Sequence, residues 1–309
     1  MAPLPSGPKL PLVSSVLAAF LCVLWGANTV AIKYSLSGLG PLTAAAVRFG
    51  ISTLILWGWA RIAGHPLRPA AGHLRPLVVN SLMFTFQLAL VYVGFTMTHA
   101  SRGALLTNLQ PFFLLFLAHF FLTGDRITPL KLIGLVLGFS GAACVFLDSP
   151  GLHGNFMAGD LLLLVSTLIW ACSAAYTKHL LQSISSIQIV FYQLLFAVPL
   201  FAAGAPVWDA PMVSGFSYGI AAAILFQGVL TTAFAFVAWT RLMHAYGAVA
   251  LHSFVFVIPV SGVLLAGVLL DEPISAMILL ALLLITGGIV TVQFSQHREM
   301  AALLHRRIR

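Results

Sequence analysis

The chain has 309 residues, of which 60% are hydrophobic and only 7% are charged. A soluble domain carries about 25% charged residues, so this chain has too few to cover its apolar surface in water. The formal net charge is +8, but the basic residues lie in short stretches between apolar runs, without the interleaved aromatic residues that would favour nucleic-acid binding. The composition predicts an integral membrane protein and no nucleic-acid partner.

Apolar segments long enough to cross a bilayer follow one another along the whole chain. A helix needs about 20 residues to cross roughly 30 Å of hydrocarbon, and the segments lack the period-two alternation of a membrane β-barrel. We therefore predict an all-α integral membrane protein with ten transmembrane helices. The predicted spans are 12–34, 41–62, 77–97, 101–122, 129–147, 159–180, 186–204, 216–241, 247–269 and 274–295.

The first span resembles a signal peptide at its start, where Lys9 precedes an apolar run. No small-residue cleavage site stands out, and the run has a counterpart later in the chain, so we predict a membrane helix. Cys22, Cys144 and Cys172 lie inside apolar runs without metal-binding spacing, and we expect buried apolar side chains. We expect no metal site and no cofactor.

The two halves of the chain are alike at a shift of about 145 to 148 residues. VLWGANTVAIKYSL at 23–36 aligns with TLIWACSAAYTKHL at 167–180. NLQPFFLLFLAHFFLTGDRIT at 108–128 aligns with FVIPVSGVLLAGVLLDEPIS at 256–275, which places Pro111 on Pro259. An odd number of helices in each half inverts the second half relative to the first, an architecture typical of secondary transporters.

Charge supports this topology. Basic residues gather in alternate loops, and acidic residues gather in the others. The basic set is Arg61, Arg68, Arg75, Arg126, Lys131, Lys178, Arg241, Arg298, Arg306, Arg307 and Arg309, and the acidic set is Asp148, Asp160, Asp209, Asp271 and Glu272. Among the basic residues of the loops, only Lys33 and Arg102 lie on the opposite side. The positive-inside rule then predicts cytoplasmic tails at 1–11 and 296–309, repeats at 12–147 and 159–295, and an external linker at 148–158.

At these motifs the chain resembles the drug/metabolite transporter superfamily, EamA type, over about residues 15–295. The resemblance rests on LWGAN (24–28), AAVRFG (45–50), THASRGALLTNLQPFFLLFLAHFFL (98–122), GDRIT (124–128), the Trp-Ala pair at 170–171, AYGAVA (245–250) and DEPIS (271–275). It implies a ten-helix carrier in a bacterial inner membrane, with a central cavity and export of amino acids or related metabolites. Asp125 replaces the usual glutamate of the GE-x-(L/I)-T segment.

Polar and aromatic residues within the spans are the candidates for a substrate cavity, because polar groups at membrane depth need a partner or water. Hydrogen bonding between helices, without substrate contact, is the alternative for each polar residue, and an interface anchor or a core position is the alternative for the tryptophans. The candidates are Trp25, Asn28, Arg48, Gln87, Tyr92, Asn108, Gln110, Trp170, Gln193, Gln227, Trp239 and His252. Pro111 and Pro259 are predicted in mid-helix, where they free the carbonyls of Thr107 and Val255 and act as hinges, or form static kinks.

Arg48 is an unusual charge at its depth. Either it snorkels to the outer surface, or it faces the cavity and attracts a carboxylate. With Lys33 and Arg102 it would then form a positive outer vestibule suited to anions or zwitterions.

The spans contain no mid-helix Asp or Glu, and only His99, His119 and His252 could titrate inside. We therefore expect a facilitator or exchanger, with proton-coupled drug or metabolite efflux as the alternative. An intramembrane enzyme is disfavoured because HExxH, GxSxG and paired acids are absent, and a channel because no filter sequence is present. The GxxxG at Gly134 and Gly138 predicts internal packing in a monomer, with a dimer face as the alternative.

Overall fold

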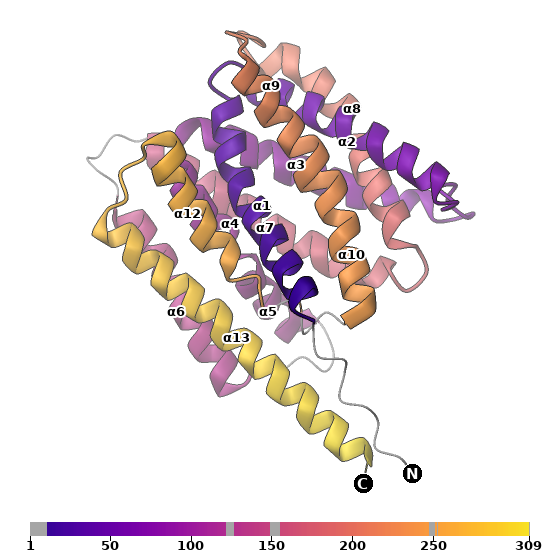
Figure 1. Cartoon of the computed structure of the whole chain (residues 1–309), viewed down its shortest axis with the longest axis vertical. Helices are drawn as coiled ribbons and strands as arrows, with labels where there is room; N and C mark the ends of the chain where they lie inside the picture. Colours follow the sequence, from indigo (N-terminus) through magenta and orange to yellow (C-terminus); the bar gives the residue numbers. More distant parts are fainter. Residues whose placement is uncertain (1–10, 122–126, 149–154, 247–250, 252, 309) are drawn as a thin grey trace.

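The computed structural model describes residues 11–121, 127–148, 155–246, 251 and 253–308, which form a bundle of helices (Figure 1). Within these residues the only strand-like feature is an isolated antiparallel bridge between Leu39 and Val213. Eight of the described helices are long and apolar enough to cross a membrane. The prediction of an all-α membrane protein is confirmed, and the number of ten spans stays a prediction.

The described helices follow the predicted spans in order. They are α1 (Leu12–Ser35), α2 (Pro41–Ile62), α3 (Leu74–Met97), α4 (Ala100–Thr107), α5 (Gln110–Phe121), α6 (Pro129–Leu147), α7 (Asn155–Leu180), α8 (Ser186–Trp208), α9 (Tyr218–Leu225), η1 (Phe226–Phe234), α10 (Ala235–Tyr246), α12 (Val257–Leu270) and α13 (Ala276–Ile308).

Several helix starts coincide with start signals in the sequence. Pro41 and Pro129 lie at the first positions of α2 and α6, where a missing N–H costs no hydrogen bond. The Thr128 hydroxyl caps α6, and the Ser185 hydroxyl caps α8 by accepting from the Gln188 N–H at 3.3 Å. These local signals explain why the predicted starts at 41, 129 and 186 are correct.

The predicted fourth and ninth spans are interrupted by tight turns. Between α4 and α5, the Leu109 N–H donates to the Leu106 carbonyl at 3.2 Å, and before α12 the Val257 N–H donates to the Phe254 carbonyl at 2.9 Å. The two donor residues are 148 residues apart in the sequence, and so are the two acceptor residues. The same turn therefore occurs at matching positions of the two halves.

Pro111 and Pro259 lie in the first turns of α5 and α12, and the prediction that they kink the middle of a helix is wrong. The first N–H groups of a helix have no partner inside the helix, so proline is tolerated there. The Val255 carbonyl, predicted to be free, accepts from the Ile258 N–H at 3.1 Å. A hinge role for the two prolines stays a prediction.

The predicted eighth span, 216–241, contains a π-helix, η1, between α9 and α10. The Thr231 and Thr232 hydroxyls both donate to the Gln227 carbonyl, at 2.8 and 2.9 Å. Side chains that bond to the backbone in this way compete with regular helical hydrogen bonds. Because π-helical turns are rare and occur frequently at functional sites, η1 directs attention to this segment.

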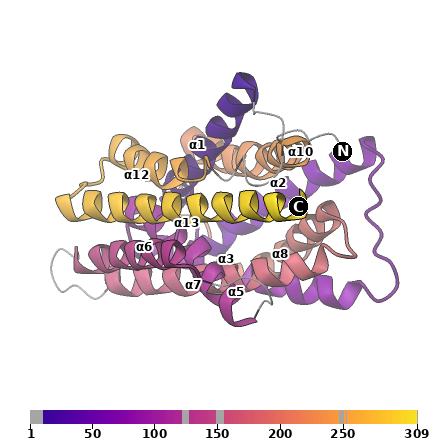
Figure 2. The same cartoon turned by 90° about the horizontal axis from the view of Figure 1, so that it is seen from below.

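The most extensive helix contacts join the N-terminal half of the chain to the C-terminal half. They pair α6 with α13, α3 with α7, α1 with α12, and α2 with α8. Figures 1 and 2 show α6 and α13 side by side along one edge of the bundle. The bundle is therefore held together by contacts between the two halves.

Glycines allow α6 and α13 to approach closely. A Cβ on Gly288 would lie 2.7 Å from the Gly134 carbonyl oxygen and 3.0 Å from the Gly138 nitrogen. The GxxxG motif thus packs inside the chain, and its contact joins the two halves instead of lying within one of them.

We expect Gly288→Ala to destabilise the protein by about 1–3 kcal/mol, because the new methyl group would push two helix backbones apart. The neighbouring Gly287 is the matched control, since a Cβ there meets nothing within 4 Å. Gly287→Ala is expected to be neutral or slightly stabilising, because alanine restricts the unfolded chain. Apparent melting temperatures in one detergent test this, and equal values for both variants would contradict it.

Candidate functional site

A buried polar network connects α2, α3 and the π-helix. Arg48 donates from Nη1 to the Tyr92 hydroxyl and from Nη2 to the Thr232 hydroxyl, both at 3.2 Å. The Tyr92 hydroxyl in turn donates to the Gln227 Oε1 at 2.9 Å. Arg48, Tyr92 and Gln227 are all buried. We call these residues, with Asn28 and Thr231 described below, the Arg48 network.

The close approach of α2 to η1 brings this network together. The Ser52 hydroxyl donates to the Gly228 carbonyl at 3.1 Å, and a Cβ on Gly228 would lie 3.2 Å from the Arg48 carbonyl oxygen. Gln227 is held from the other side, because its Nε2 donates to the Ala31 carbonyl of α1 at 3.0 Å. The irregular backbone of η1 thus offers carbonyl groups to side chains of neighbouring helices.

The network continues into α1. The Thr231 hydroxyl lies 3.0 Å from the Asn28 Oδ1, and the Trp25 indole N–H donates to the Thr231 carbonyl at 3.1 Å. Trp25 also contacts Trp239 of α10 edge to face, with 5.0 Å between ring centroids. Six of the predicted cavity residues therefore form one connected group: Trp25, Asn28, Arg48, Tyr92, Gln227 and Trp239.

Arg48 carries a charge that the described protein groups do not neutralise. The residue is 7% exposed, and its Nε has no hydrogen-bond partner. Among the residues described, no acidic side chain forms an ion pair with it. The alternative that Arg48 snorkels to the surface is wrong, because its guanidinium is bonded inside the bundle. A guanidinium stays charged at every physiological pH, so this site can attract an anion.

The other predicted cavity residues lie outside this group. Gln87 is buried, and its Oε1 has no hydrogen-bond partner. The Asn108 Nδ2 donates to the Ala104 carbonyl at 2.6 Å, beside the turn between α4 and α5. Gln110 begins α5, and Gln193 is half-buried in α8. Trp170 is 43% exposed, and His252 lies outside the described residues.

Sequence reasoning missed the threonines of η1. It also missed a buried polar contact between α3 and α7, which is separate from the Arg48 network. The Asn80 Oδ1 accepts from Ser173 at 3.1 Å and from Thr177 at 3.2 Å, and its Nδ2 has no partner. Threonine and serine are common in membrane helices, so their type gave no signal. Asn80 is an amide inside the predicted span 77–97, as Gln87 is, and could have been selected on the same ground.

Arg102 and two aspartates form a buried ion cluster at one end of the bundle. The Arg102 Nε donates to Asp160 at 3.1 Å, its Nη2 also pairs with Asp160, and its Nη1 donates to Asp148 at 3.3 Å. Asp160 also accepts from the Thr98 hydroxyl at 2.6 Å, and Asp148 accepts from the Ser275 hydroxyl. The predicted positive vestibule is therefore wrong for Arg102, because its charge is neutralised by these carboxylates.

Lys33, the other exception to the charge pattern, has hydrogen-bond acceptors at the same end of the bundle. Its ammonium donates to the carbonyls of Phe95 and Thr98, both at 2.8 Å. Burial is the main reason that the pKa of His99 lies below its ordinary value, with Glu272 opposing and Lys33 adding to the shift. His99 is therefore neutral at pH 7.

Two carboxylates cap helices of the other half at this end. Glu272 accepts from the backbone N–H groups of Ala100 at 2.6 Å and Ser101 at 2.9 Å, at the start of α4. Asp209 accepts from the Thr43 N–H at 2.7 Å, at the start of α2. Negative charge is favourable at a helix N-terminus. We call this end, with Asp148, Asp160, Asp209 and Glu272, the acidic end.

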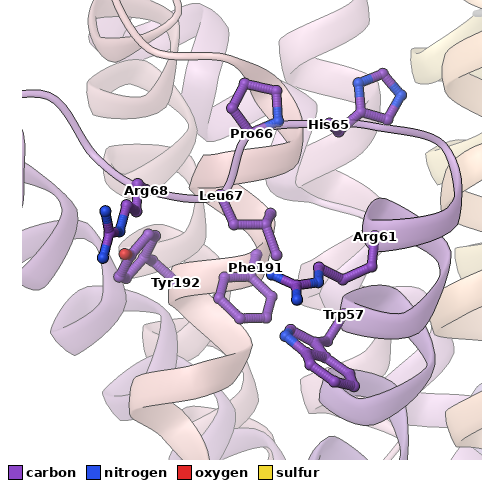
Figure 3. A pocket seen from close by; sticks show the side chains of 8 residues that line it. All are labelled: Trp57, Arg61, His65, Pro66, Leu67, Arg68, Phe191 and Tyr192. Atoms are coloured by element: carbon purple, nitrogen blue, oxygen red, sulfur yellow. The ribbon is translucent and has the colours of Figure 1, made fainter.

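Two pockets lie at the opposite end of the bundle. One, of about 380 Å³, lies between the C-terminal end of α2 and the N-terminal end of α8 (Figure 3). The Arg61 guanidinium in this pocket lies 5.6 Å from the centre of the Trp57 ring. A second, of about 480 Å³, lies where α3 begins and α7 ends. Trp57 follows Arg48 by nine residues, roughly 13 Å along the helix axis, so the first pocket is separate from the Arg48 network.

Comparison with known families gives one consistent result. The model of the EamA-like transporter family matches residues 13–147 and again residues 157–294. The same family model therefore matches this chain twice, once in each half.

Curated relatives cover nearly the whole chain. The uncharacterized transporter YvbV of Bacillus subtilis (strain 168) is 28% identical over 300 residues, 94% of this chain and 95% of that protein. A probable amino-acid metabolite efflux pump of Escherichia coli (strain K12) is 24% identical over 283 residues, 89% of this chain and 92% of the pump. The uncharacterized inner membrane transporter YedA of the same strain is 26% identical over 301 residues, which are 93% of this chain and 92% of YedA.

A solved structure described only as a crystal structure of a protein has a TM-score of 0.67 with this chain. It is 19% identical, and the match covers 90% of this chain and 97% of the other. At this identity the likeness shows a shared fold alone.

Proposed function

The chain belongs to the EamA-like transporter family, and from this premise we propose that it is a secondary transporter that moves a small metabolite by alternating access. The observation that carries the proposal is the Arg48 network, a buried polar group built from α1 to α3 of one half and η1 of the other. Buried charge in a membrane protein is costly, and it commonly marks a substrate pathway.

Ten spans in two inverted five-helix repeats are part of this proposal. If each span is replaced by its counterpart in the other half, the contact of α1 with α12 becomes the contact of α7 with α4 and α5, which the structure also contains. In the same way, the contact of α3 with α7 becomes the contact of the eighth span (α9, η1 and α10) with α1. The pairs α2–α8 and α6–α13 convert into themselves. This pattern, with the matching turns before Pro111 and Pro259, supports a repeat that allows two related arrangements of the halves.

The proposed orientation has both termini in the cytoplasm. Arg61 and Arg75 lie at the ends of α2 and α3 that are remote from the acidic end. The positive-inside rule places such basic ends in the cytoplasm and the acidic end outside. The two exceptions to the rule, Lys33 and Arg102, have partners at the acidic end and do not weaken the bias.

The proposed substrate is an amino acid or a related metabolite, exported across a bacterial inner membrane by facilitation or exchange. The name of the Escherichia coli relative and the location given for YedA support this choice. In the described part of the chain, the Arg48 network contains no carboxylate that could carry a proton, which favours transport without proton coupling. We also propose a monomer, because the glycine faces of α6 and α13 are used within one chain.

Transport in proteoliposomes tests this function. Vesicles are loaded with a mixture of radiolabelled amino acids, and efflux is followed with and without unlabelled substrate outside. We expect efflux that external substrate accelerates and that a pH gradient leaves unchanged, because an exchanger moves fastest when loaded in both directions. Protein-free vesicles are the control. Efflux that follows the pH gradient would contradict the proposed facilitation, and hydrolysis of substrate would contradict transport altogether.

A further inference from the structure

We propose that the Arg48 guanidinium binds one carboxylate of the transported substrate, so that the carrier selects small monocarboxylates, zwitterionic amino acids included, over their amides and over cations. The identification of the ligand as cargo rests on the proposed function. The binding site itself rests on charge and geometry around Arg48.

The charge of Arg48 is uncompensated. A buried ion is costly unless an opposite charge and hydrogen bonds replace its lost hydration. Arg102, another buried arginine, has Asp160 and Asp148 beside it. Arg48 has the hydroxyl groups of Tyr92 and Thr232 and the face of the Phe49 ring, whose centre lies 4.9 Å from the guanidinium carbon, and none of these groups carries a negative charge. An anion from outside the chain would supply what is missing.

The directions of the hydrogen bonds around Arg48 also favour an anion. The Tyr92 hydroxyl donates to Gln227 Oε1, and the Thr232 hydroxyl donates to the Gln227 carbonyl. Both hydroxyl oxygens therefore turn lone pairs toward Arg48 and hold the guanidinium in place. A guanidinium has five N–H groups, of which the bonds to Tyr92 and Thr232 use only two, and the Nε–H is unpaired. The remaining donors suit the two oxygens of a carboxylate.

The surroundings of Arg48 favour a carboxylate over a cation or an amide. The described neighbours of the site offer neutral polar groups, from Asn28 and Gln227, and the Trp25–Trp239 pair, but no carboxylate. A substrate cation would meet Arg48 without a compensating charge and would be repelled. An amide would leave the buried charge unpaired, and buried sites discriminate strongly against ligands that leave their polar groups unpaired.

Thermal shift and calorimetric binding in nanodiscs test the site without requiring transport. The probes are L-leucine, 4-methylpentanoate and 4-methylpentanamide, in buffer whose only anion is chloride. The variants are Arg48→Gln, which removes the charge, and Arg48→Lys, which keeps the charge but lacks the paired N–H donors of the guanidinium. Arg75→Gln, at an exposed position near the start of α3, is the control.

We expect the two carboxylates to bind the wild type and the amide not to bind. Arg48→Gln should weaken carboxylate binding about 30-fold or more, and Arg48→Lys by less. The empty Arg48→Gln protein should melt at or above the wild-type temperature, because an unpaired buried charge has been removed. A structural arginine would give the opposite result, a lower melting temperature.

The proposal is overturned if Arg48→Gln keeps carboxylate binding within about threefold, or if the amide binds as well as the acid. It is also overturned if chloride alone saturates the site. The outcomes separate the two proposals. Transport of a neutral metabolite that is indifferent to Arg48→Gln would leave the transporter intact and remove the carboxylate site. Carboxylate binding through Arg48 without any flux would keep the site and remove the transport.

Discussion

Oxidation of a Leu39→Cys, Val213→Cys double variant is expected to abolish nearly all transport, and a reductant is expected to restore it. Leu39 lies in the loop between α1 and α2, and Val213 in the loop between α8 and α9, so the two belong to different halves. Alternating access requires the halves to separate at one end and close at the other. A covalent link between these loops would hold the acidic end closed.

The backbone geometry suits this disulfide. The Gly40 N–H donates to the Met212 carbonyl at 2.9 Å, and the Ser214 N–H donates to the Gly38 carbonyl at 3.0 Å. Leu39 and Val213 are therefore a non-hydrogen-bonded antiparallel pair, for which Cα atoms lie about 4.5 Å apart. Disulfides span Cα distances of about 4.4–6.8 Å.

The measurement is efflux from proteoliposomes before and after treatment with an oxidant and then a reductant. Cys22, Cys144 and Cys172 are first replaced by alanine, because free thiols would otherwise compete. Each single cysteine variant, treated in the same way, controls for oxidation itself. Full transport by the cross-linked protein would mean that the two loops move as one body. It would contradict the proposed separation of the halves at this end.

Asp160→Asn is expected to destabilise the protein by about 3–5 kcal/mol, the usual cost of removing one partner from a buried ion pair. Asp160 is fully buried, and it accepts hydrogen bonds from both Arg102 and Thr98. The substitution keeps the shape of the side chain and removes its charge. Arg102 would then retain only Asp148, whose contact is longer at 3.3 Å and whose side chain is 19% exposed.

The apparent melting temperature should rank the three aspartates by burial. Asp160→Asn should cause the largest fall, Asp148→Asn a smaller one, and Asp271→Asn none. Asp271 is the matched control because its side chain is exposed. Its backbone is in the left-handed conformation, with φ of 51°, which asparagine also adopts. Replacing both Arg102 and Asp160 by apolar residues should recover part of the loss. A fall for Asp160→Asn no larger than that for Asp271→Asn would contradict the assigned role.

Apolar runs in the sequence predicted the regular helices and missed the irregular ones. The prolines at 41 and 129 and the caps at 128 and 185 lie at helix starts, where each acts within one helical turn. The break after Thr107 and the π-helix at 226–234 depend on what surrounds them. Tyr92, Trp25 and Ser52 come from other helices to bond with η1 or its side chains, and no window of the sequence contains them together.

The sequence by itself determined that the chain enters a membrane as apolar helices and that its halves are alike. Both properties depend on composition and on the order of residues along the chain, since partition into lipid is decided segment by segment. Only the tertiary structure decided that Arg48 meets Tyr92 and Gln227, that Arg102 is neutralised by Asp160, and that Gly288 faces Gly134. Such meetings depend on the rotation and register of helices far apart in the chain, which packing alone sets.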